Sequence, residues 1–148
     1  MIGRASHVDV PALVEIECEC FDADAWSETL VRAELDAPSR TVLVARDGLR
    51  IVGYASITAV GDLAELLRIA VRHDARGVGW GRQLLDEELR IARAGGAMRI
   101  LLEVAHDNDR ALRLYRSAGF TDIDRRVGYY GPERDALVLG RRLNDSWA

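Results

Sequence analysis

The sequence IAVRHDARGVGWGRQLLDEELRIA, residues 69–92, contains three glycines that alternate with other residues between an apolar run and a helical pattern. Gly77, Gly79 and Gly81 allow the backbone to turn sharply or to approach another group closely. The run that follows, residues 81–96, has the apolar spacing of an amphipathic helix and ends in a Gly-Gly pair. This stretch therefore predicts a strand, a tight turn and a helix in direct succession.

The patterns on both sides of this stretch predict a mixed α/β fold. With the nearly all-apolar run RILLEVA (99–105), the strand, turn and helix make a β-α-β unit, whose strands should be parallel neighbours with a right-handed crossover. The earlier runs at 41–46 and 51–60 are joined across DGL, which predicts an antiparallel hairpin. The expected order is β-α-α-β-β-β-α-β-α-β-β, with antiparallel N-terminal strands and a parallel central pair. Strands are expected at 1–5, 41–46, 51–60, 64–71, 99–105, 121–127 and 136–143, and helices after Asp9, after Ser27, at 81–96 and at 108–119.

Composition and charge narrow the class of protein. A chain of 148 residues, 49% apolar and 30% charged, is expected to form one domain over 1–148. The net charge of −4 argues against direct nucleic-acid binding as its main role. No apolar run reaches the roughly 20 residues needed to cross a bilayer, and MIGRASHVDV lacks the apolar core of a secretory signal. We therefore expect a cytoplasmic protein that does not bind membranes.

The cysteines and histidines do not predict a metal site. Cys18 and Cys20 lie on different faces of the expected helix, so a disulfide between them is not expected, and a lone C-x-C pair makes a poor zinc site. His7, His73 and His106 have no ligand-like spacing. We expect no bound metal and small, core-facing cysteines in a reducing compartment.

The glycine turn is suited to an anion. N–H groups at the start of a helix have no intrahelical partner and carry a partial positive charge, so a phosphate or pyrophosphate is a natural ligand. Arg76 and Arg82 flank the turn and add positive charge. A phosphate-binding NTPase loop is excluded because the segment contains no Lys, and the G-x-G-x-G spacing differs from the dinucleotide fingerprint. A tight turn without a ligand stays open as an alternative.

Arg76-x-x-Gly79-x-Gly81 resembles the (Q/R)-x-x-G-x-(G/A) motif of the GNAT acyltransferase superfamily, and the order of elements is similar over essentially the whole chain. The resemblance implies that amides of the loop bind the pyrophosphate of acetyl-CoA and that the preceding strand pairs with the pantetheine arm. Gly77 and Val78 depart from the family, which often has basic residues there. The implied cofactor contacts from this region are Ile69, Ala70, Val71, Arg76, Gly77, Val78, Gly79, Trp80, Gly81 and Arg82.

Two residues are candidates for acid–base chemistry. Acetyl transfer to an amine needs a base for the amine and an acid for the departing thiolate. Glu103 is the only acidic residue of RILLEVA, and burial in an apolar strand makes a carboxyl group a stronger base. The sequence is equally compatible with the alternative that Glu103 lies at a strand end, where its carboxylate contacts water or pairs with an arginine. Tyr115 is the second candidate, and it shares a helix face with Ala111, Leu114 and Ala118. The alternative is that Tyr115 is an ordinary core residue whose hydroxyl has a hydrogen-bond partner.

The segment LEVAHDNDRALRLYRSAGF (102–120) resembles L-E-V-R-x-x-N-x-x-A-x-x-L-Y-x-x-x-G-F of the RimI family of ribosomal-protein alanine N-acetyltransferases. This resemblance implies that Glu103 is the general base, that Tyr115 protonates the leaving thiolate and that Asn108 contacts the cofactor arm. By itself Asn108 would be a helix cap. Ala105 and His106 depart from the family, in which an Arg commonly follows the Val.

Two further segments, AWSE (25–28) and RRVGYYGPERDALVL (125–139), also resemble that family. Trp26 and Tyr130, with Tyr129, are candidates for the walls of a substrate-peptide groove, and ordinary packing is the alternative. The implied partner is the N-terminus of a protein, ribosomal and Ala-starting. An α-amine with a pKa near 7.7–8.0 is about 3–4 kcal/mol easier to deprotonate than a Lys amine near 10.4.

The sequence is compatible with three functions. The first is acetylation of a protein N-terminus, and the second is acetylation of a lysine side chain or a small amine. The third is an acyl-CoA-binding regulatory domain without catalysis, against which the presence of both Glu103 and Tyr115 counts, because binding alone needs neither.

Overall fold

The computed structural model describes residues 1–143, and its strands and helices follow the predicted order. The sheet has seven strands in the order β1-β2-β3-β4-β5-β7-β6. The strands are β1 (Ile2–Arg4), β2 (Arg40–Asp47), β3 (Arg50–Val60), β4 (Leu63–Val71), β5 (Arg99–Ala105), β6 (Thr121–Arg126) and β7 (Ala136–Arg142). The helices are α1 (Val10–Phe21), α2 (Glu28–Asp36), α3 (Trp80–Ala94) and α4 (Asp109–Ser117), with short 3-10 turns at His7–Asp9, Asp22–Asp24 and His73–Ala75.

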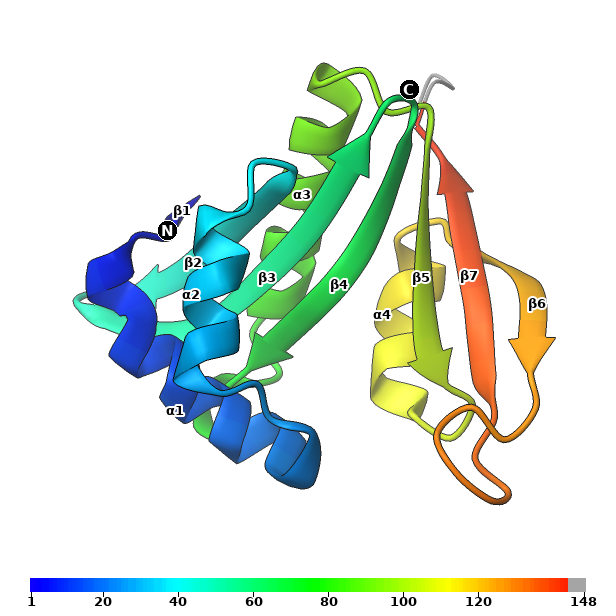
Figure 1. Ribbon diagram of the computed structural model, residues 1–148, viewed down its shortest axis with the longest axis horizontal. Helices are drawn as coiled ribbons and strands as arrows, with labels where there is room; N and C mark the ends of the chain where they lie inside the picture. Colours follow the sequence, from blue (N-terminus) through cyan, green and yellow to red (C-terminus); the bar gives the residue numbers. More distant parts are fainter. Residues whose placement is uncertain (144–148) are drawn as a thin grey trace.

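The helices cover the two faces of the sheet unequally (Figure 1). α1 and α2 pack on one face of β2, β3 and β4, where Leu13, Val31 and Tyr54 belong to one core cluster. α3 covers the opposite face, and its Leu89 shares a core cluster with Leu112 of α4. That cluster also contains residues of β3, β4, β5 and β7, so it joins both halves of the sheet.

Local signals explain most of the helix boundaries. Ser27 Oγ accepts a hydrogen bond from Leu30 N–H at the start of α2, as expected of a cap. Asp9 occupies the N-cap position of α1, but its side chain does not cap that helix. Its carboxylate instead accepts from Ser6 N–H and pairs with Arg46 on β2 at 2.9 Å. This aspartate thus ties the start of α1 to the sheet.

The parallel pair predicted from the β-α-β unit is present but short. β4 and β5 pair only from Leu63 with Arg99 to Glu65 with Leu101. Leu67 is the extra residue of a β-bulge, because Ser56 of β3 pairs with Arg68 and the next β3 residue pairs with Leu66. Beyond it the two strands separate (Figure 1). We call the stretch of β4 and β5 past the Glu65–Leu101 pair the divergence.

Within residues 1–143, no helix is both long and apolar enough to cross a membrane.

Candidate active site

The glycine turn has the conformation that its sequence predicts. Gly77 (φ +86°) and Gly79 (φ +98°) lie in the left-handed region, where a Cβ atom is strained. Gly79 is the N-cap of α3 and provides no side-chain hydrogen bond to the first turn. Within residues 1–143, no N-cap side chain bonds the N–H groups of that turn, which is the arrangement that binds a phosphate. Trp80 packs against the α3-side core, whereas Val78 is exposed.

The two arginines beside the turn are tied to the protein. Arg76 Nε donates to Val71 O at 2.9 Å, so its guanidinium folds back onto the end of β4. Arg82 Nε pairs with Asp86 at 2.9 Å, and its Nη1 donates to Ser117 Oγ at 3.2 Å. Arg82 thus links α3 to the end of α4. Both positive charges lie beside the turn, as predicted, but each also has a structural role.

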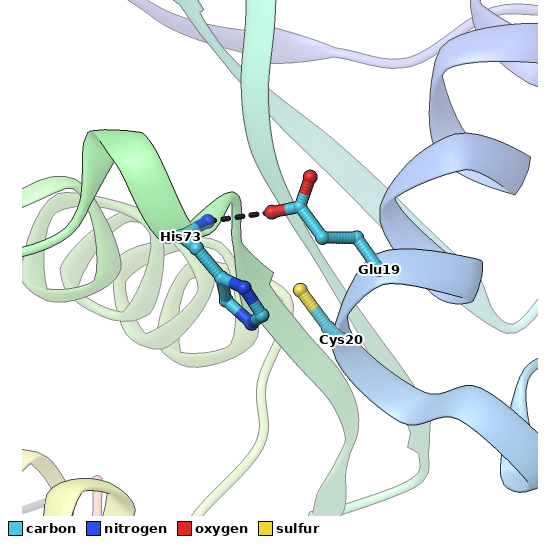
Figure 2. Close-up of side chains that lie close together, drawn as sticks. All are labelled: Glu19, Cys20 and His73. Atoms are coloured by element: carbon cyan, nitrogen blue, oxygen red, sulfur yellow. Dashed lines mark hydrogen bonds between the residues drawn. The ribbon is translucent and has the colours of Figure 1, made fainter.

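The end of α1 is fastened to the segment before the turn by Glu19, Cys20 and His73 (Figure 2). Glu19 Oε2 accepts from His73 N–H at 2.5 Å, and Arg76 Nη2 lies 3.7 Å from Cys20 Sγ. Burial raises the pKa of the Cys20 thiol, and the positive charge of Arg76 opposes that shift. One ligand atom from each of the three residues lies within 4.8 Å of the others, a spacing that the sequence did not reveal. The contacts of Glu19 and Cys20 hold the segment before the glycine turn against α1.

The end of β4 has one paired edge and one open edge. Ile69, Ala70 and Val71 pair with Ala55, Tyr54 and Gly53 of β3. No strand pairs with their other edge among residues 1–143, because β5 has already separated from β4. An unpaired strand edge can hydrogen-bond an extended amide-containing ligand, as the predicted pantetheine contact requires.

Gly53 is a site residue that the sequence analysis missed. A Cβ atom there would lie 2.7 Å from Ala70 O and 3.3 Å from Leu84 Cδ1. Only glycine lets β3 approach β4 this closely beneath α3. Its position in the middle of the strand pattern was the available signal, because glycine weakens a strand interior unless backbone approaches closely there.

Glu103 lies on β5 within the divergence and has a cationic neighbour. Its Oε1 is 3.3 Å from Arg126 Nη1, and its side chain is 22% exposed. A hydrogen bond with Glu103, together with the negative charge of that carboxylate, raises the pKa of Tyr129. Glu103 therefore pairs with an arginine, as one of the two sequence interpretations expected, and its side chain stays partly exposed.

Tyr115 is buried on α4, with its ring centroid 5.9 Å from that of Phe120. Burial raises its pKa, and the nearby phenol of Tyr130 adds to the shift. Burial also raises the pKa of Tyr130, and the charge of Glu103 raises it further. Tyr130 therefore interacts electrostatically with both Glu103 and Tyr115, which come from different elements.

The remaining predicted residues have defined places. Asn108 Oδ1 accepts from Ala111 N–H at 3.3 Å and so caps α4, which uses only the oxygen of its side-chain amide. Trp26 lies in the segment before α2, with its backbone N–H bonded to Glu17. Tyr130 is 41% exposed and packs edge-to-face against Tyr129 at 5.0 Å between ring centroids.

Glu17 and Arg68 were also missed, although both interrupt an apolar pattern. Glu17 lies on the face of α1 that carries Leu13 and Ile16, and Arg68 is a charge within the strand AELLRIAV. They form an ion pair of 2.9 Å between α1 and β4. A charged residue at a core position is informative because its burial needs a partner.

A cavity of about 520 Å³ is lined by residues of β5, β6 and β7 and by Gly119. Its lining includes Arg99, Thr121 and Ile123 but none of the predicted site residues.

Comparison with known proteins places these features in a family. The acetyltransferase (GNAT) family model matches residues 10–120. The N-alpha-acetyltransferase RimI of Mycobacterium tuberculosis is 38% identical over 150 aligned residues, which span 97% of this chain and 93% of that protein. The ribosomal protein bS18-alanine N-acetyltransferase of Salmonella typhimurium is 34% identical, over 93% of this chain and 94% of its own length.

A solved structure agrees with the sequence matches. The crystal structure of the ribosomal-protein-S18-alanine N-acetyltransferase from Escherichia coli superposes with a TM-score of 0.89 at 27% identity. The superposition covers 99% of this chain and 95% of that one.

Proposed function

The chain belongs to the acetyltransferase (GNAT) family and is an acetyl-CoA-dependent N-acetyltransferase, and from that premise we propose that it acetylates the N-terminal α-amine of a protein. The proposed acceptor is an Ala-starting ribosomal protein. The Salmonella relative is named for the alanine of ribosomal protein bS18, and the Mycobacterium relative is named for α-amine acetylation. We further propose that residues 1–148 act as one domain and that acetyl-CoA is used without a metal.

The observation that supports the proposal is the electrostatic coupling of Tyr130 to Glu103, Tyr115 and Arg68. These three residues come from β5, α4 and β4, so the proposed base and the proposed acid both interact with the segment between β6 and β7. Such a convergence of titratable groups beside an open strand edge is expected of a catalytic site.

The chain's own residues fit the cofactor. The uncapped first turn of α3 would hold the pyrophosphate through its N–H groups, and the open edge of β4 at Ile69–Val71 would hold the amide-rich arm. Arg76 and Arg82 lie beside the turn, and Asn108 is the further proposed contact for the cofactor arm. The cofactor supplies an acetyl thioester.

Glu103 and Tyr115 divide the proton transfers. Glu103 accepts a proton from the acceptor amine, directly or through a water molecule, as the new C–N bond forms. Tyr115 gives its phenolic proton to the sulfur as the C–S bond breaks. Because burial raises the pKa of Tyr115, its proton is retained until a basic thiolate develops. Arg126 is about half exposed, so it can leave Glu103 when the amine arrives.

One assay tests this function. The protein is incubated with acetyl-CoA and peptides that begin with Ala or with other residues, beside internal-lysine peptides with blocked N-termini and polyamines. Acetylated product and free thiol are measured together. Product on the α-amines of Ala-starting peptides supports the proposal, whereas product confined to lysine peptides or polyamines contradicts it. Thiol release without acetylated product would contradict it as well.

A further inference from the structure

A carboxylate that the proposed reaction does not use lies beside the divergence. Glu17 on α1 is fully buried. Its Oε1 accepts hydrogen bonds from Trp26 N–H at 2.7 Å and Arg68 Nη2 at 2.9 Å. Its Oε2 accepts from Arg68 Nε at 3.2 Å and from the Tyr54 hydroxyl. Four donors offset the cost of burying an ionised carboxylate, and together they hold Arg68 in one orientation.

Arg68 is also held between two aromatic rings. Its guanidinium carbon lies 3.9 Å from the ring centroid of Phe21 and 4.4 Å from that of Trp26. Its Nη2 also donates to Asp24 O at 2.8 Å. A guanidinium stacked on rings loses little further entropy when it forms another hydrogen bond. Arg68 is thus a pre-oriented donor, and 17% of its side chain is exposed.

The bulge in β4 places Arg68 on the α1 side of the sheet. Leu66 belongs to the core cluster beneath α3, and regular alternation would put Arg68 on that same face. The extra residue Leu67 reverses the alternation, so that Arg68 faces α1. Arg68 follows the last β4–β5 pair by three residues and Glu103 follows it by two. Both side chains therefore come from the divergence.

The electrostatics agree with this placement. The charge of Glu103 raises the pKa of Tyr130 in addition to the effect of burial, and the charge of Arg68 lowers it. Arg68 and Glu103 thus act on the same phenol from opposite strands. Ile100, Leu102 and Val104 face the core beneath α3 and α4, so Glu103 faces the opposite side of the sheet, which is the side that Arg68 faces. An acceptor amine at Glu103 would therefore lie on the same side of the sheet as Arg68.

We propose that Arg68 is a specificity residue whose guanidinium donates a hydrogen bond to the carbonyl oxygen of the acceptor's first residue. In an N-terminal peptide this oxygen is three bonds from the amine nitrogen, so both can be recognised at once. A lysine side chain or a polyamine has no carbonyl so close to its amine. Glu17 already balances the positive charge of Arg68 through hydrogen bonds to its Nε and Nη2. The guanidinium should therefore bind a neutral carbonyl oxygen more favourably than a free anion. Arg68 would therefore select α-amines.

The inference rests on the proposed function and is tested with two acceptors. One is an Ala-starting peptide, and the other is isopropylamine, which keeps the Cα and methyl group of alanine but lacks the carbonyl. Arg68→Met keeps an unbranched side chain between the two rings. The companion Glu17→Gln/Arg68→Met avoids a buried unpaired carboxylate if the single variant folds poorly. Arg46→Met is the matched control, because it also removes an arginine from a buried carboxylate, that of Asp9 at the N-cap of α1.

We expect Arg68→Met to lower kcat/KM for the peptide by about 10- to 100-fold, the usual value of a charge-assisted hydrogen bond. The KM for acetyl-CoA and kcat/KM for isopropylamine should match those of Arg46→Met. An equal loss on both acceptors, or a peptide loss no larger than in the control, would overturn the inference. If the wild-type protein acetylates isopropylamine but not the peptide, the proposed function itself fails, and that result is visible before any variant is made.

Discussion

At Glu103 the carboxylate pairs with an arginine, which is one of the two environments that the sequence left open. Arg126 approaches it from β6, and Tyr129 shares a hydrogen bond with it. Tyr115 has the opposite environment, since burial dominates and keeps its phenol protonated. Because their surroundings differ in this way, Glu103 is suited to accept a proton and Tyr115 is suited to donate one.

Substitution of either group should slow turnover and spare cofactor binding. We expect Glu103→Gln and Tyr115→Phe each to lower kcat by about 10²- to 10⁴-fold, the usual contribution of one proton-transfer group. Both substitutions are nearly isosteric, so affinity for acetyl-CoA should stay near that of the wild type. Steady-state kinetics and calorimetry measure the two quantities. Near-normal kcat in both variants would remove these residues from the mechanism.

Glu88 on α3 predicts a pH dependence of stability. It is fully buried, and its carboxylate oxygens have no hydrogen-bond partner among residues 1–143. Burial raises its pKa to about 9, with Arg4 partly opposing the shift. The folded state therefore holds a proton that the unfolded state releases near pH 4.5. Stability should fall as pH rises from about 4.5 to 9, by at most about 1.4 kcal/mol per pH unit from this group.

Glu88→Gln should remove most of this slope, because the amide cannot ionise. Urea denaturation at several pH values between 5 and 9 measures it. Glu87→Gln is the control: Glu87 is paired with Arg90, which lowers its pKa, so it does not titrate in this window. An unchanged slope in Glu88→Gln would show that this carboxyl group is not the source.

At the scale of elements, the junction of β4 and α3 combines a strand edge and a helix N-terminus. The bulge at Leu67 separates β4 from β5, and the left-handed Gly79 starts α3 without a side-chain cap. Among residues 1–143, no strand pairs with the outer edge at 69–71 and no N-cap side chain bonds the first turn of α3. Together the two features fit one long ligand with amides at one end and phosphates at the other.

Gly79 and Gly81 should respond differently to alanine. Gly79→Ala places a Cβ at φ +98° and should cost about 1–2 kcal/mol of stability. Gly81 lies inside α3, and a Cβ there would meet Leu114 Cδ2 at 3.6 Å and Val71 Cγ2 at 3.8 Å, which are ordinary contacts. Gly81→Ala should therefore not destabilise the protein. Thermal denaturation compares the two, and an equal loss in both would contradict this account of the turn.

At the scale of the whole molecule, the sheet consists of two halves joined by a short parallel pairing and by the core beneath α3 and α4. Residues near the predicted reaction come from both halves: Arg68 from β4, and Glu103 with Tyr130 from the other side. A ligand that lies along the divergence would contact both halves at once.

Acetyl-CoA should therefore stabilise the fold and protect defined amides. At 100 times its Kd it should raise the free energy of unfolding by about 2.7 kcal/mol. Hydrogen exchange should slow most at residues 69–71 and 77–82, where the ligand would cover backbone N–H groups. Free adenosine, which lacks both pyrophosphate and pantetheine, is the control. Protection elsewhere, with these two segments unaffected, would refute the predicted cofactor site.

The sequence by itself determined the order of elements, the parallel central pair, the glycine turn and the Ser27 and Asn108 caps. These features depend on apolar periodicity and on backbone groups a few residues apart, which are local properties of the chain. The family was also recognisable, because its motifs are short and contiguous.

Only the tertiary structure decided which side chains from separate elements interact. The pairing of Glu103 with Arg126, the electrostatic interaction of Tyr130 with Tyr115 and the burial of Glu17 against Arg68 are examples. Strict alternation along β4 would also put Arg68 on the wrong face, because one extra residue in the strand shifts the alternation. A charge in an apolar run signals that a partner exists, but the identity of that partner depends on strand register and loop path, which long-range packing sets.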